Sequence, residues 1–560
     1  MKIVECVPNF SEGRDQNIIQ AIASEIERSP DARLIDVDPG ADTNRTVVTM
    51  VGPPEAIKEA AFRAIRKAAE LLDMRKHRGA HPRLGATDVC PFVPVSGVTM
   101  DECAELARSL GARVAAELGI PVFLYEEAAS RPERRNLANI RQGEYEGLAE
   151  KLKDPEWAPD FGEPVFNPRA GATVIGAREF LIAYNVNLNT RDAKLASQIA
   201  ANLRESGKPQ RDEQGAIVRD EDGNKVMIPG SLKSVKAGGW FISRYGLAQV
   251  TMNITNYKIT PMHTAFEQAC AEAEKLGLRV TGSEIVGVVP REAMLQAGCH
   301  FLEKQGKSAG QPERDLIDAA ILSLGLSQVS PFDATKKIIE YRIETPGPLV
   351  SQTVRSFVDE LSTDSATPGG GSVAALTGAL GAGLAAMVAN LTIGKKSYRD
   401  VEPEMRQIAA EAQELKDELL RSVDNDARAF DKVMEAMRLP KGSEEERALR
   451  QQALDHAYLG AVMVPMGVLR RAVLLEEQAR AVAQKGFKPS LSDAGVAALA
   501  GRAAAEGAFY NILINLGSMS ADPSVAEIAR ESEDLLQRVV AAADVVARLV
   551  REGLATGHQQ

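Results

Sequence analysis

The stretch from Glu344 to Leu349, ETPGPL, divides the 560-residue chain into two halves of different character. Two prolines and a glycine within six residues end regular structure, so this stretch is typical of a linker. Up to about Ile343, short β-branched runs alternate with amphipathic helical patterns, whereas almost everything beyond Leu349 has helical periodicity. The sequence therefore predicts sheet-containing domains before the linker and a helical domain after it.

The first half carries the same order of elements twice. In the first copy we expect strands at residues 3–7, 33–37, 46–51 and 90–95, and helices at 17–28 and 54–72. In the second copy we expect strands at 180–188, 235–242, 247–254 and 279–289, and helices at 193–205 and 264–276. A helix at 100–118 and a strand at 122–125 follow the first copy. A highly charged insertion at 211–230 interrupts the second copy, and we expect an exposed hairpin or a mobile loop there.

Strand–helix–strand–strand–helix–strand is the split βαβ order of ferredoxin-like folds. Its helices cover one face of the sheet and leave the other free, so two such sheets facing each other would enclose a cleft. The predicted fold class is multidomain: two α+β ferredoxin-like (split βαβ) subdomains followed by an all-α helical domain. The expected boundaries are residues 1–180 and 181–343 for the two subdomains, 344–351 for the linker, and 352–560 for the helical domain.

Charge and cysteine content exclude several classes of protein. Lys and Arg number 66 against 77 Asp and Glu, which gives a net charge of −11 and argues against a nucleic-acid binder. The five cysteines contain no C-x-x-C pair, so we expect neither a zinc site nor a disulfide framework, and a reducing, cytoplasmic compartment fits best. The N-terminal apolar run is short and acidic residues follow it at once, which is unlike a secretory signal.

Residues 373–393, VAALTGALGAGLAAMVANLTI, are uncharged over a length that could span a bilayer. The segment consists mainly of alanine and glycine, which gain little from lipid. We therefore expect a buried, tightly packed helix of a soluble protein and no membrane partner. Because small residues let helix backbones approach closely, an interface between subunits is also compatible with this composition.

His81 is the first candidate for chemistry. It lies in MRKHRGAHPRLGATDVCPF (residues 74–92), between a predicted helix and an apolar strand. Pro82 biases His81 towards extended backbone, so the segment should form a loop that presents His81, Arg83 and Asp88 near a strand end. Imidazole titrates near neutrality and can both accept and donate a proton. From spacing alone, a histidine that only bonds a backbone carbonyl remains the alternative.

Two glycine-rich segments are candidates for ligand binding. Residues 161–176, FGEPVFNPRAGATVIG, connect the two copies and could supply backbone N–H groups and the ring of Phe166 to a flat ligand, or act as a plain connector. Residues 366–372, ATPGGGS, precede the alanine-rich helix and place Gly369, Gly370 and Gly371 where N–H groups could face an anion. A close helix start explains the second segment equally well.

Asp426 is the candidate acid in the second half. On the helix expected to end at Met437, an apolar stripe runs along one face and Asp426 falls within it, whereas Asp424 should project away and pair with Arg428. A carboxyl group on a packed face loses hydration, which raises its pKa and suits acid–base work. A buried aspartate that caps or pairs structurally is the alternative. Asp493 opens a later helix, where capping is its ordinary role.

Several long segments resemble the formimidoyltransferase-cyclodeaminase family. VECVPNFSEGRD (4–15), VDPGADTNRTV (37–47), HPRLGATDVCPF (81–92) and GSEIVGVVP (282–290) are similar to glutamate formimidoyltransferase. TPGGGSVAALTGALGAGLAAMVANLT (367–392) and SVDNDARAF (422–430) are similar to formimidoyltetrahydrofolate cyclodeaminase. The resemblance runs nearly end to end. Two departures are the length of the 211–230 insertion and Phe487 after Gly486, where the family usually has Gly-Asn.

The resemblance implies two reactions of histidine degradation. The formimino group moves from N-formimino-L-glutamate to tetrahydrofolate, and 5-formiminotetrahydrofolate then closes to 5,10-methenyltetrahydrofolate with release of ammonia. It implies His81 as the transferase acid/base and Asp426 as the cyclodeaminase acid/base. It also implies a homo-oligomer, a folate co-substrate that can carry a polyglutamate tail, and no metal. The folate-binding stretch aligns with Gly162, Glu163, Pro164, Val165, Phe166, Asn167, Pro168, Arg169, Ala170 and Gly171.

Three further residue roles and two alternative functions stay open at this point. Arg83 could bind a substrate carboxylate bidentately. Gly369 to Gly371 and Asp493 are possible substrate contacts, and the cations at 395, 396 and 399 could attract a glutamate tail or simply end a solvated helix. The alternatives are an enzyme with one working half, for example a transferase half acting as a 5-formyltetrahydrofolate cycloligase, and a folate-binding oligomeric scaffold.

Overall fold

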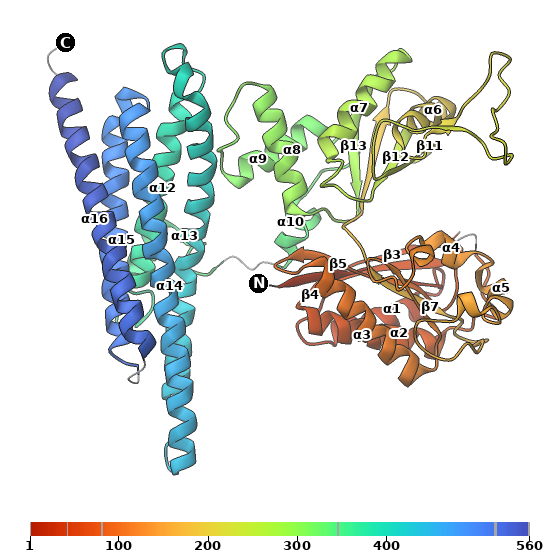
Figure 1. Ribbon diagram of the computed structural model, residues 1–560, viewed down its shortest axis with the longest axis horizontal. Coiled ribbons are helices and arrows are strands. Elements are labelled where there is room, and N and C mark those ends of the chain that lie inside the picture. The colour runs from red at the N-terminus through yellow and green to blue at the C-terminus, as the bar shows by residue number, and fades with distance from the viewer. Residues whose placement is uncertain (1, 42, 80–81, 344–346, 520–522, 558–560) are drawn as a thin grey trace. The chain divides into compact units, whose positions relative to one another are not determined.

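The computed structural model describes residues 2–41, 43–79, 82–343, 347–519 and 523–557 (Figure 1). The chain separates into two compact units: residues 1–294 with 324–344, and residues 295–323 with 345–560. The first unit holds a seven-stranded and a four-stranded β-sheet with their helices and a small two-stranded sheet, and the second unit is helical. This confirms two sheet-containing modules followed by a helical region. The first part of the predicted linker, 344–346, lies outside the described residues, and the subdomain boundaries stay predictions.

The first sheet has seven strands and mixes antiparallel with parallel pairing. Strand β4 pairs with β3 on one side and with β1 and β2 on the other. Strand β5 pairs antiparallel with β1 and β2, and then parallel with β7, which in turn pairs parallel with β6. The strands are β1 (Ile3–Cys6), β2 (Asn9–Phe10), β3 (Arg33–Gly40), β4 (Arg45–Gly52), β5 (Thr87–Ser96), β6 (Val122–Glu126) and β7 (Thr173–Ala177).

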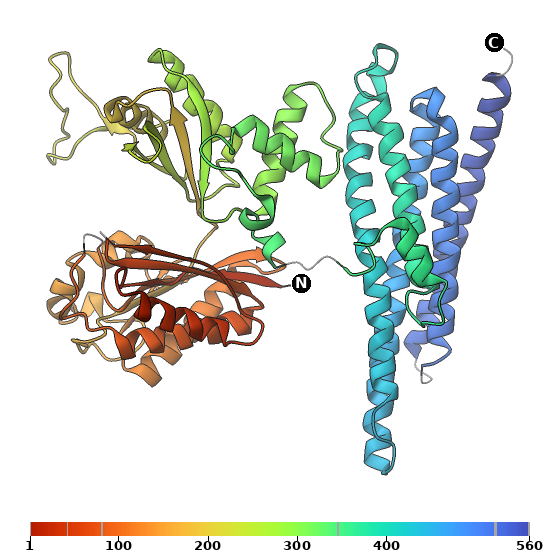
Figure 2. The ribbon, with the colours of Figure 1, turned by 180° about the vertical axis from the view of Figure 1, so that it is seen from behind.

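Three amphipathic helices cover one face of this sheet: α1 (Gln16–Glu27), α2 (Pro54–Leu71) and α3 (Met100–Leu118) (Figures 1 and 2). Alternation along β1 turns Val4 and Cys6 into the core beneath these helices and leaves Glu5 for the opposite face. Helix α3 begins with a capping box, in which Thr99 and Glu102 bond each other's backbone N–H, and its bounds agree with the prediction.

Strand β7 is a correction to the sequence analysis. The prediction treated residues 161–176 as a connector, but Thr173–Ala177 forms a fully buried strand between β5 and β6. The strand is five residues long and contains Gly176, whose added Cβ would overlap the backbone and ring of Tyr125. A short buried strand of this kind has no alternation to reveal it.

The second sheet has the order β11-β12-β8-β13, with every neighbouring pair antiparallel. Its strands are β8 (Ile182–Leu188), β11 (Val235–Ile242), β12 (Leu247–Ile254) and β13 (Val280–Val286), with helices α6 (Ala193–Leu203) and α7 (Met262–Lys275). The predicted strands 235–242 and 247–254 are confirmed at both ends. The chain order is β8-α6-β11-β12-α7-β13, which is the order that the sequence predicts.

The charged insertion is built from two eight-residue repeats, RDEQGAIV (211–218) and RDEDGNKV (219–226), between β9 (Lys208–Pro209) and β10 (Met227–Ile228). In each repeat the aspartate carboxylate accepts two backbone N–H groups, as Asp212 does from Gln214 and Ala216. In each repeat the arginine donates to the glycine carbonyl at 2.6 Å. The arm is therefore ordered by its own local bonds.

The helical unit is a bundle of long helices. Beyond residue 351 the described chain forms six α-helices. They are α11 (Val354–Leu361), α12 (Gly370–Thr392), α13 (Glu402–Met437), α14 (Glu444–Lys485), α15 (Leu491–Leu516) and α16 (Pro523–Gly557). The remaining α-helices of the chain are α4 (Leu137–Arg141), α5 (Glu144–Lys151), α8 (Arg291–Lys304), α9 (Glu313–Leu324) and α10 (Ala334–Lys337).

Helix α12 packs against α13, α14 and α15, and its small residues let it do so closely. A Cβ at Gly381 would stand 2.8 Å from the Leu475 side chain and 2.9 Å from the Ala497 carbonyl. By length and composition alone, α12 and α14 could each cross a membrane. Core helices of soluble proteins pass the same test, and 61% of the most apolar part of α12 is buried inside the protein.

Candidate functional site

The loop that carries His81 is pinned on its C-terminal side to the predicted folate stretch. His81 itself lies outside the described residues. The Ala86 N–H donates to Ala170 O at 2.8 Å, and the Ala172 N–H donates to Leu84 O at 3.1 Å. Gly85 lies so close that an added Cβ would overlap the carbonyl oxygens of Ala170 and Ala172. The structure thus brings together two segments that are about 80 residues apart in the sequence.

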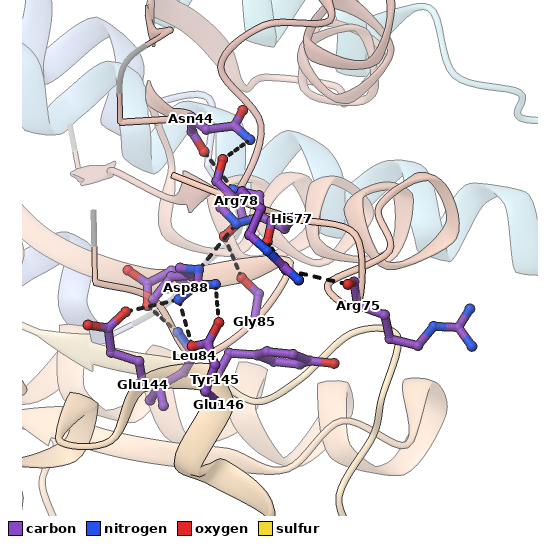
Figure 3. A network of polar contacts seen from close by, with 12 residues as sticks. Asn44, Arg75, His77, Arg78, Leu84, Gly85, Asp88, Glu144, Tyr145 and Glu146 are labelled. Carbon is purple, nitrogen blue, oxygen red and sulfur yellow. Dashed lines mark hydrogen bonds and ion pairs between the residues drawn. The ribbon is translucent and has the colours of Figure 1, made fainter. Parts of the chain in front are cut away.

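His77 pins the other side of the loop, as Figure 3 shows. The Arg83 Nε–H donates to His77 Nδ1 at 3.2 Å. Because Nδ1 accepts, Nε2 carries the proton and donates to Asn44 O at 2.9 Å. Burial lowers the pKa of His77, which agrees with this neutral tautomer. His77 is therefore a structural histidine in a fixed orientation.

Arg83 is already paired within the protein. Its side chain is buried, and its Nη1 and Nη2 donate to the two carboxylate oxygens of Glu146 at 2.9 and 2.6 Å. Nη1 also donates to Glu144 at 2.9 Å. Both glutamates lie in the first turn of α5, where their charge complements the helix dipole. A substrate carboxylate would have to displace Glu146, so this geometry favours a positioning role for Arg83 over the predicted substrate contact.

Asp88 anchors the same loop from inside the sheet. Its side chain is fully buried, accepts the Leu84 N–H at 3.0 Å and pairs with Arg141 of α4. Burial raises the pKa of Asp88, and the contacts from Arg141 and Leu84 oppose that shift. The carboxyl group is thus engaged in holding the loop and α4 together, and it does not face open solvent.

A cavity of about 750 Å³ lies beside this loop in the first unit. Pro82, the residue after His81, forms part of its wall, together with Arg141, Glu126 at the end of β6, Arg178 after β7, and Lys236 of β11. Parallel strands β6 and β7 both end at this wall, and cavities in mixed α/β structures commonly lie at such carboxyl ends. Glu126 was not among the predicted site residues. The sequence feature that could have indicated it is the pair of glutamates, 126 and 127, directly after the apolar run VFLY.

The predicted folate stretch lines a separate cavity of about 690 Å³ against α3. The residues of the stretch that reach it are Gly162, Glu163, Val165, Phe166, Asn167 and Pro168. The Phe166 ring lies 5.5 Å from the Tyr145 ring, between their centroids. Positive φ angles at Gly162 (90°) and Gly171 (70°) explain two of the glycines. Ala170 and Gly171 lie instead against the His81 loop, and Arg169 donates to Leu72 O at 3.3 Å.

Asp426 lies against the glycine-rich start of α12, where the sequence analysis placed a possible anion site. The Ser372 hydroxyl donates to its carboxylate at 3.1 Å. A Cβ at Gly371 would stand 2.5 Å from the Asp426 carboxyl carbon, so only glycine fits there. Burial raises the pKa of Asp426, and the hydrogen bonds from Ser372 lower it in part. Asn511 of α15 lies beside Gly370, 3.4 Å from the position of an added Cβ.

The prediction for Asp424 was wrong. Its side chain is buried and accepts the backbone N–H groups of Leu349 at 2.8 Å and Val350 at 3.3 Å. Arg428 donates to the Asp424 carbonyl oxygen and not to its carboxylate. The end of the linker therefore packs over this side of α13, a contact between positions 75 residues apart. Asp424 anchors the linker to the helical unit.

Gly369, Asp493 and Lys395 are among the remaining predicted positions of the helical half. Gly369 is the N-cap of α12 and has no side chain to cap it, and Asp493 lies in the first turn of α15. Asn515 bonds across to Ala461 O at 3.0 Å, as a structural asparagine would. Lys395 lies over the Phe487 ring at 4.2 Å, so the residue that departs from the family pattern packs onto one of the predicted cations.

Glu476 is a buried acid that the sequence analysis did not single out. It lies on α14 with its side chain fully buried against Gly501 of α15. Neither carboxylate oxygen has a hydrogen-bond partner in the described structure, and burial raises its pKa to about 8. Within the described ranges, no group of three or more His, Cys, Asp or Glu side chains is arranged to hold a metal.

Comparison with known families matches three parts of the chain. Residues 3–178 match the N-terminal subdomain of the formiminotransferase domain, and residues 183–344 match the formiminotransferase domain. Residues 353–534 match the family described as formiminotransferase-cyclodeaminase. These three segments cover most of both units.

Individual relatives match the whole chain or one half of it. Formimidoyltransferase-cyclodeaminase of Rattus norvegicus is 44% identical over 548 residues, which are 97% of this chain and 98% of the rat protein. Glutamate formimidoyltransferase of Thermoplasma acidophilum is 43% identical over 57% of this chain and 99% of its own length. A solved formiminotetrahydrofolate cyclodeaminase of Thermotoga maritima is 33% identical over 37% of this chain and 96% of its own, with a TM-score of 0.32.

Proposed function

Because the chain belongs to the formiminotransferase-cyclodeaminase family, we propose which of its residues carry each of the two activities. The protein is a bifunctional folate enzyme. It transfers the formimino group from N-formimino-L-glutamate to tetrahydrofolate, and it then cyclodeaminates 5-formiminotetrahydrofolate to 5,10-methenyltetrahydrofolate and ammonia. The observation that carries this function is the 44% identity over 97% of the chain to a relative that joins both activities in one polypeptide.

We assign proton transfer in the first reaction to His81. Folate N5 attacks the formimino carbon and forms a tetrahedral intermediate. N5 must then lose a proton, and the glutamate nitrogen must gain one before the bond between it and the carbon breaks. One imidazole can do both, and such catalysis supplies about 10²–10⁴-fold. The support for this assignment is that Pro82, its neighbour, lines the 750 Å³ cavity and that His77 and Gly85 fix the loop on both sides.

Folate binding is assigned to Gly162–Gly171, and the structure offers two reasons for it. Six of the ten residues line a cavity large enough for a flat ring system, with the Phe166 ring in its wall. The end of the stretch is hydrogen-bonded to the His81 loop. A folate bound by the stretch would therefore lie only a few residues from the catalytic segment.

Asp426 is the proposed acid of the second reaction. N10 of the bound folate attacks the formimino carbon and closes the five-membered ring. The formimino nitrogen leaves as ammonia only after it has been protonated. A carboxyl group whose burial raises its pKa is able to hold that proton and to take one back from N10. Because Gly370 and Gly371 have no side chains, the start of α12 can lie directly against the Asp426 carboxyl group and Asn511.

The ferredoxin-like description of the two sheet modules is also a proposal. In the second module, the order β11-β12-β8-β13 has the first and third strands at the centre, as a split βαβ unit requires. The first module has the corresponding order β3-β4-β1-β5, again with its first and third strands at the centre. Strands β7 and β6 extend this sheet beyond β5.

We further propose a cytoplasmic homo-oligomer that also accepts polyglutamylated folate. Helix α12 carries no charge and presents an exposed apolar stripe at spacings of seven and four residues: Leu380, Met387 and Leu391. Leu380 is 61% exposed in the single chain, and a second subunit would cover it. The five cysteines contain no C-x-x-C pair, which fits a reducing compartment.

One coupled assay tests the function. The protein is given N-formimino-L-glutamate and tetrahydrofolate, and the absorbance of 5,10-methenyltetrahydrofolate and the release of ammonia are followed together. Both products are expected in equal amounts. Formimino transfer without ammonia would mean that only the first half is active. If neither formimino transfer nor ammonia were detected, the remaining explanation would be a folate-binding scaffold without enzymatic activity.

A further inference from the structure

Glu126 stands out in the wall of the 750 Å³ cavity. It is the last residue of β6 and has a φ of 52°, the left-handed region that side-chain-bearing residues seldom adopt. Such backbone is strained and persists at sites where the surrounding structure imposes it. Here the Glu126 N–H bonds Arg135 O at 3.3 Å and the next N–H, of Glu127, bonds Ala177 O at 2.9 Å, and these two bonds hold the strand end in place.

Among the described residues, the partly desolvated Glu126 carboxylate has no close partner. Across the described ranges it makes no salt bridge, whereas the next residue, Glu127, pairs with Arg135. Burial raises the pKa of Glu126 even though Lys236 and Arg178 act on it from a distance. A half-buried carboxylate without a hydrogen-bonding cation gains stability from any cationic ligand that reaches it.

The same cavity holds the opposite charge. Lys236 is exposed in the wall and makes no salt bridge in the part of the chain that the structure describes, and the Arg178 side chain donates there to the Glu179 carbonyl at 2.9 Å. The other charged side chains of the wall are paired: Glu127 with Arg135, Glu144 with Arg83, Glu179 with Lys258, and Arg141 with Asp88. One carboxylate, Glu126, and two cations, Lys236 and Arg178, are thus left for a ligand beside Pro82. A complementary ligand carries one compact cation and carboxylates a few bonds away.

We propose that Glu126 is the residue that selects a cationic amidine donor, by receiving the protonated formimino group of N-formimino-L-glutamate, while Lys236 and Arg178 receive its carboxylates. This proposal rests on the proposed transferase function and deepens it. A protonated formimino group is planar and presents parallel N–H donors, which match the two oxygens of one carboxylate. The corresponding N-formyl donor is neutral and leaves the Glu126 carboxylate unpaired, so Glu126 discriminates against it.

The test compares the two donors in the full-length protein. In the variant Glu126→Gln, kcat/KM for N-formimino-L-glutamate should fall about 10- to 100-fold, mainly through KM, because a hydrogen bond to a charged partner is lost. Transfer from N-formyl-L-glutamate should change less than about 3-fold, so the preference between donors collapses. Lys236→Gln should raise KM for both donors alike. Glu133→Gln, an exposed charge in the loop after β6, is the matched control and should alter neither.

Two further readouts keep the outcome decisive. Cyclodeamination of pre-made 5-formiminotetrahydrofolate should be unchanged in Glu126→Gln, which shows that the second unit is folded, and the retained transfer from N-formyl-L-glutamate shows that the first unit is folded. Calorimetric titration of N-formimino-L-glutamate should show weaker binding to the variant even without turnover. An equal fall for both donors, or unaltered binding of the formimino donor, would overturn the assignment of Glu126. A wild-type protein that binds the formimino donor through Glu126 but transfers nothing would instead overturn the proposed function.

Discussion

Replacing Gly371 by alanine should disable ammonia release and leave formimino transfer intact. A Cβ at position 371 would stand 2.5 Å from the Asp426 carboxyl carbon, whereas ordinary contacts lie at 3.4–4 Å. The carboxyl group must therefore move by about 1 Å, which also breaks its hydrogen bond with the Ser372 hydroxyl. A misplacement of about 1 Å costs roughly 100-fold in rate when a catalytic group has to meet a bound substrate. We expect kcat for ammonia release to fall by about that factor.

The assay supplies pre-made 5-formiminotetrahydrofolate and follows the absorbance of 5,10-methenyltetrahydrofolate, while transfer is measured separately with N-formimino-L-glutamate. Gly460→Ala on α14 is the control, because its added Cβ meets nothing within 4 Å and a helical glycine replaced by alanine gains about 1 kcal/mol. Normal ammonia release in folded Gly371→Ala protein would refute the role of Asp426 that the geometry supports. Loss of both activities together would show that the effect is not local.

Two other predictions concern stability and assembly. Glu476 has a pKa of about 8 in the folded protein against 4.5 in the unfolded chain, so its contribution to stability is lost as pH rises through that window, by about 1.4 kcal/mol per pH unit. The stability gain of Glu476→Gln, measured by urea unfolding at pH 5 and pH 8, should therefore grow with pH, and a gain that is constant with pH would contradict the burial argument. Leu380→Asp should break the proposed oligomer into smaller species in sedimentation velocity; an unchanged sedimentation coefficient would mean that the α12 stripe is not an interface.

Local patterns predicted the elements of the fold well and the pairing between distant segments poorly. Strands β11 and β12 and helix α3 begin and end where alternation and capping indicate. Strand β7 was missed because its partners, β5 and β6, are remote in the sequence and its own five residues carry no period. Parallel insertion of one strand between two others is a tertiary property.

In the candidate site, too, local patterns were predicted well and contacts between distant segments were not. The helical stripe placed Asp426 on a packed face, and the structure brings the glycine-rich segment to it. The stripe misplaced Asp424, because the linker that covers it comes from 75 residues earlier. Arg83 was predicted to be available for substrate, but its partners Glu144 and Glu146 follow about 60 residues later. The partners of these charged side chains are set by the tertiary structure, and spacing along the sequence does not indicate them.

The central claim is a division of labour between an imidazole in the first unit and a carboxyl group in the second. Its most direct measurement is a crossed assay of His81→Ala and Asp426→Asn with both substrates. His81→Ala should lose transfer from N-formimino-L-glutamate and keep cyclodeamination of pre-made 5-formiminotetrahydrofolate, and Asp426→Asn should do the reverse. Full transfer by His81→Ala, or full ammonia release by Asp426→Asn, would contradict the account.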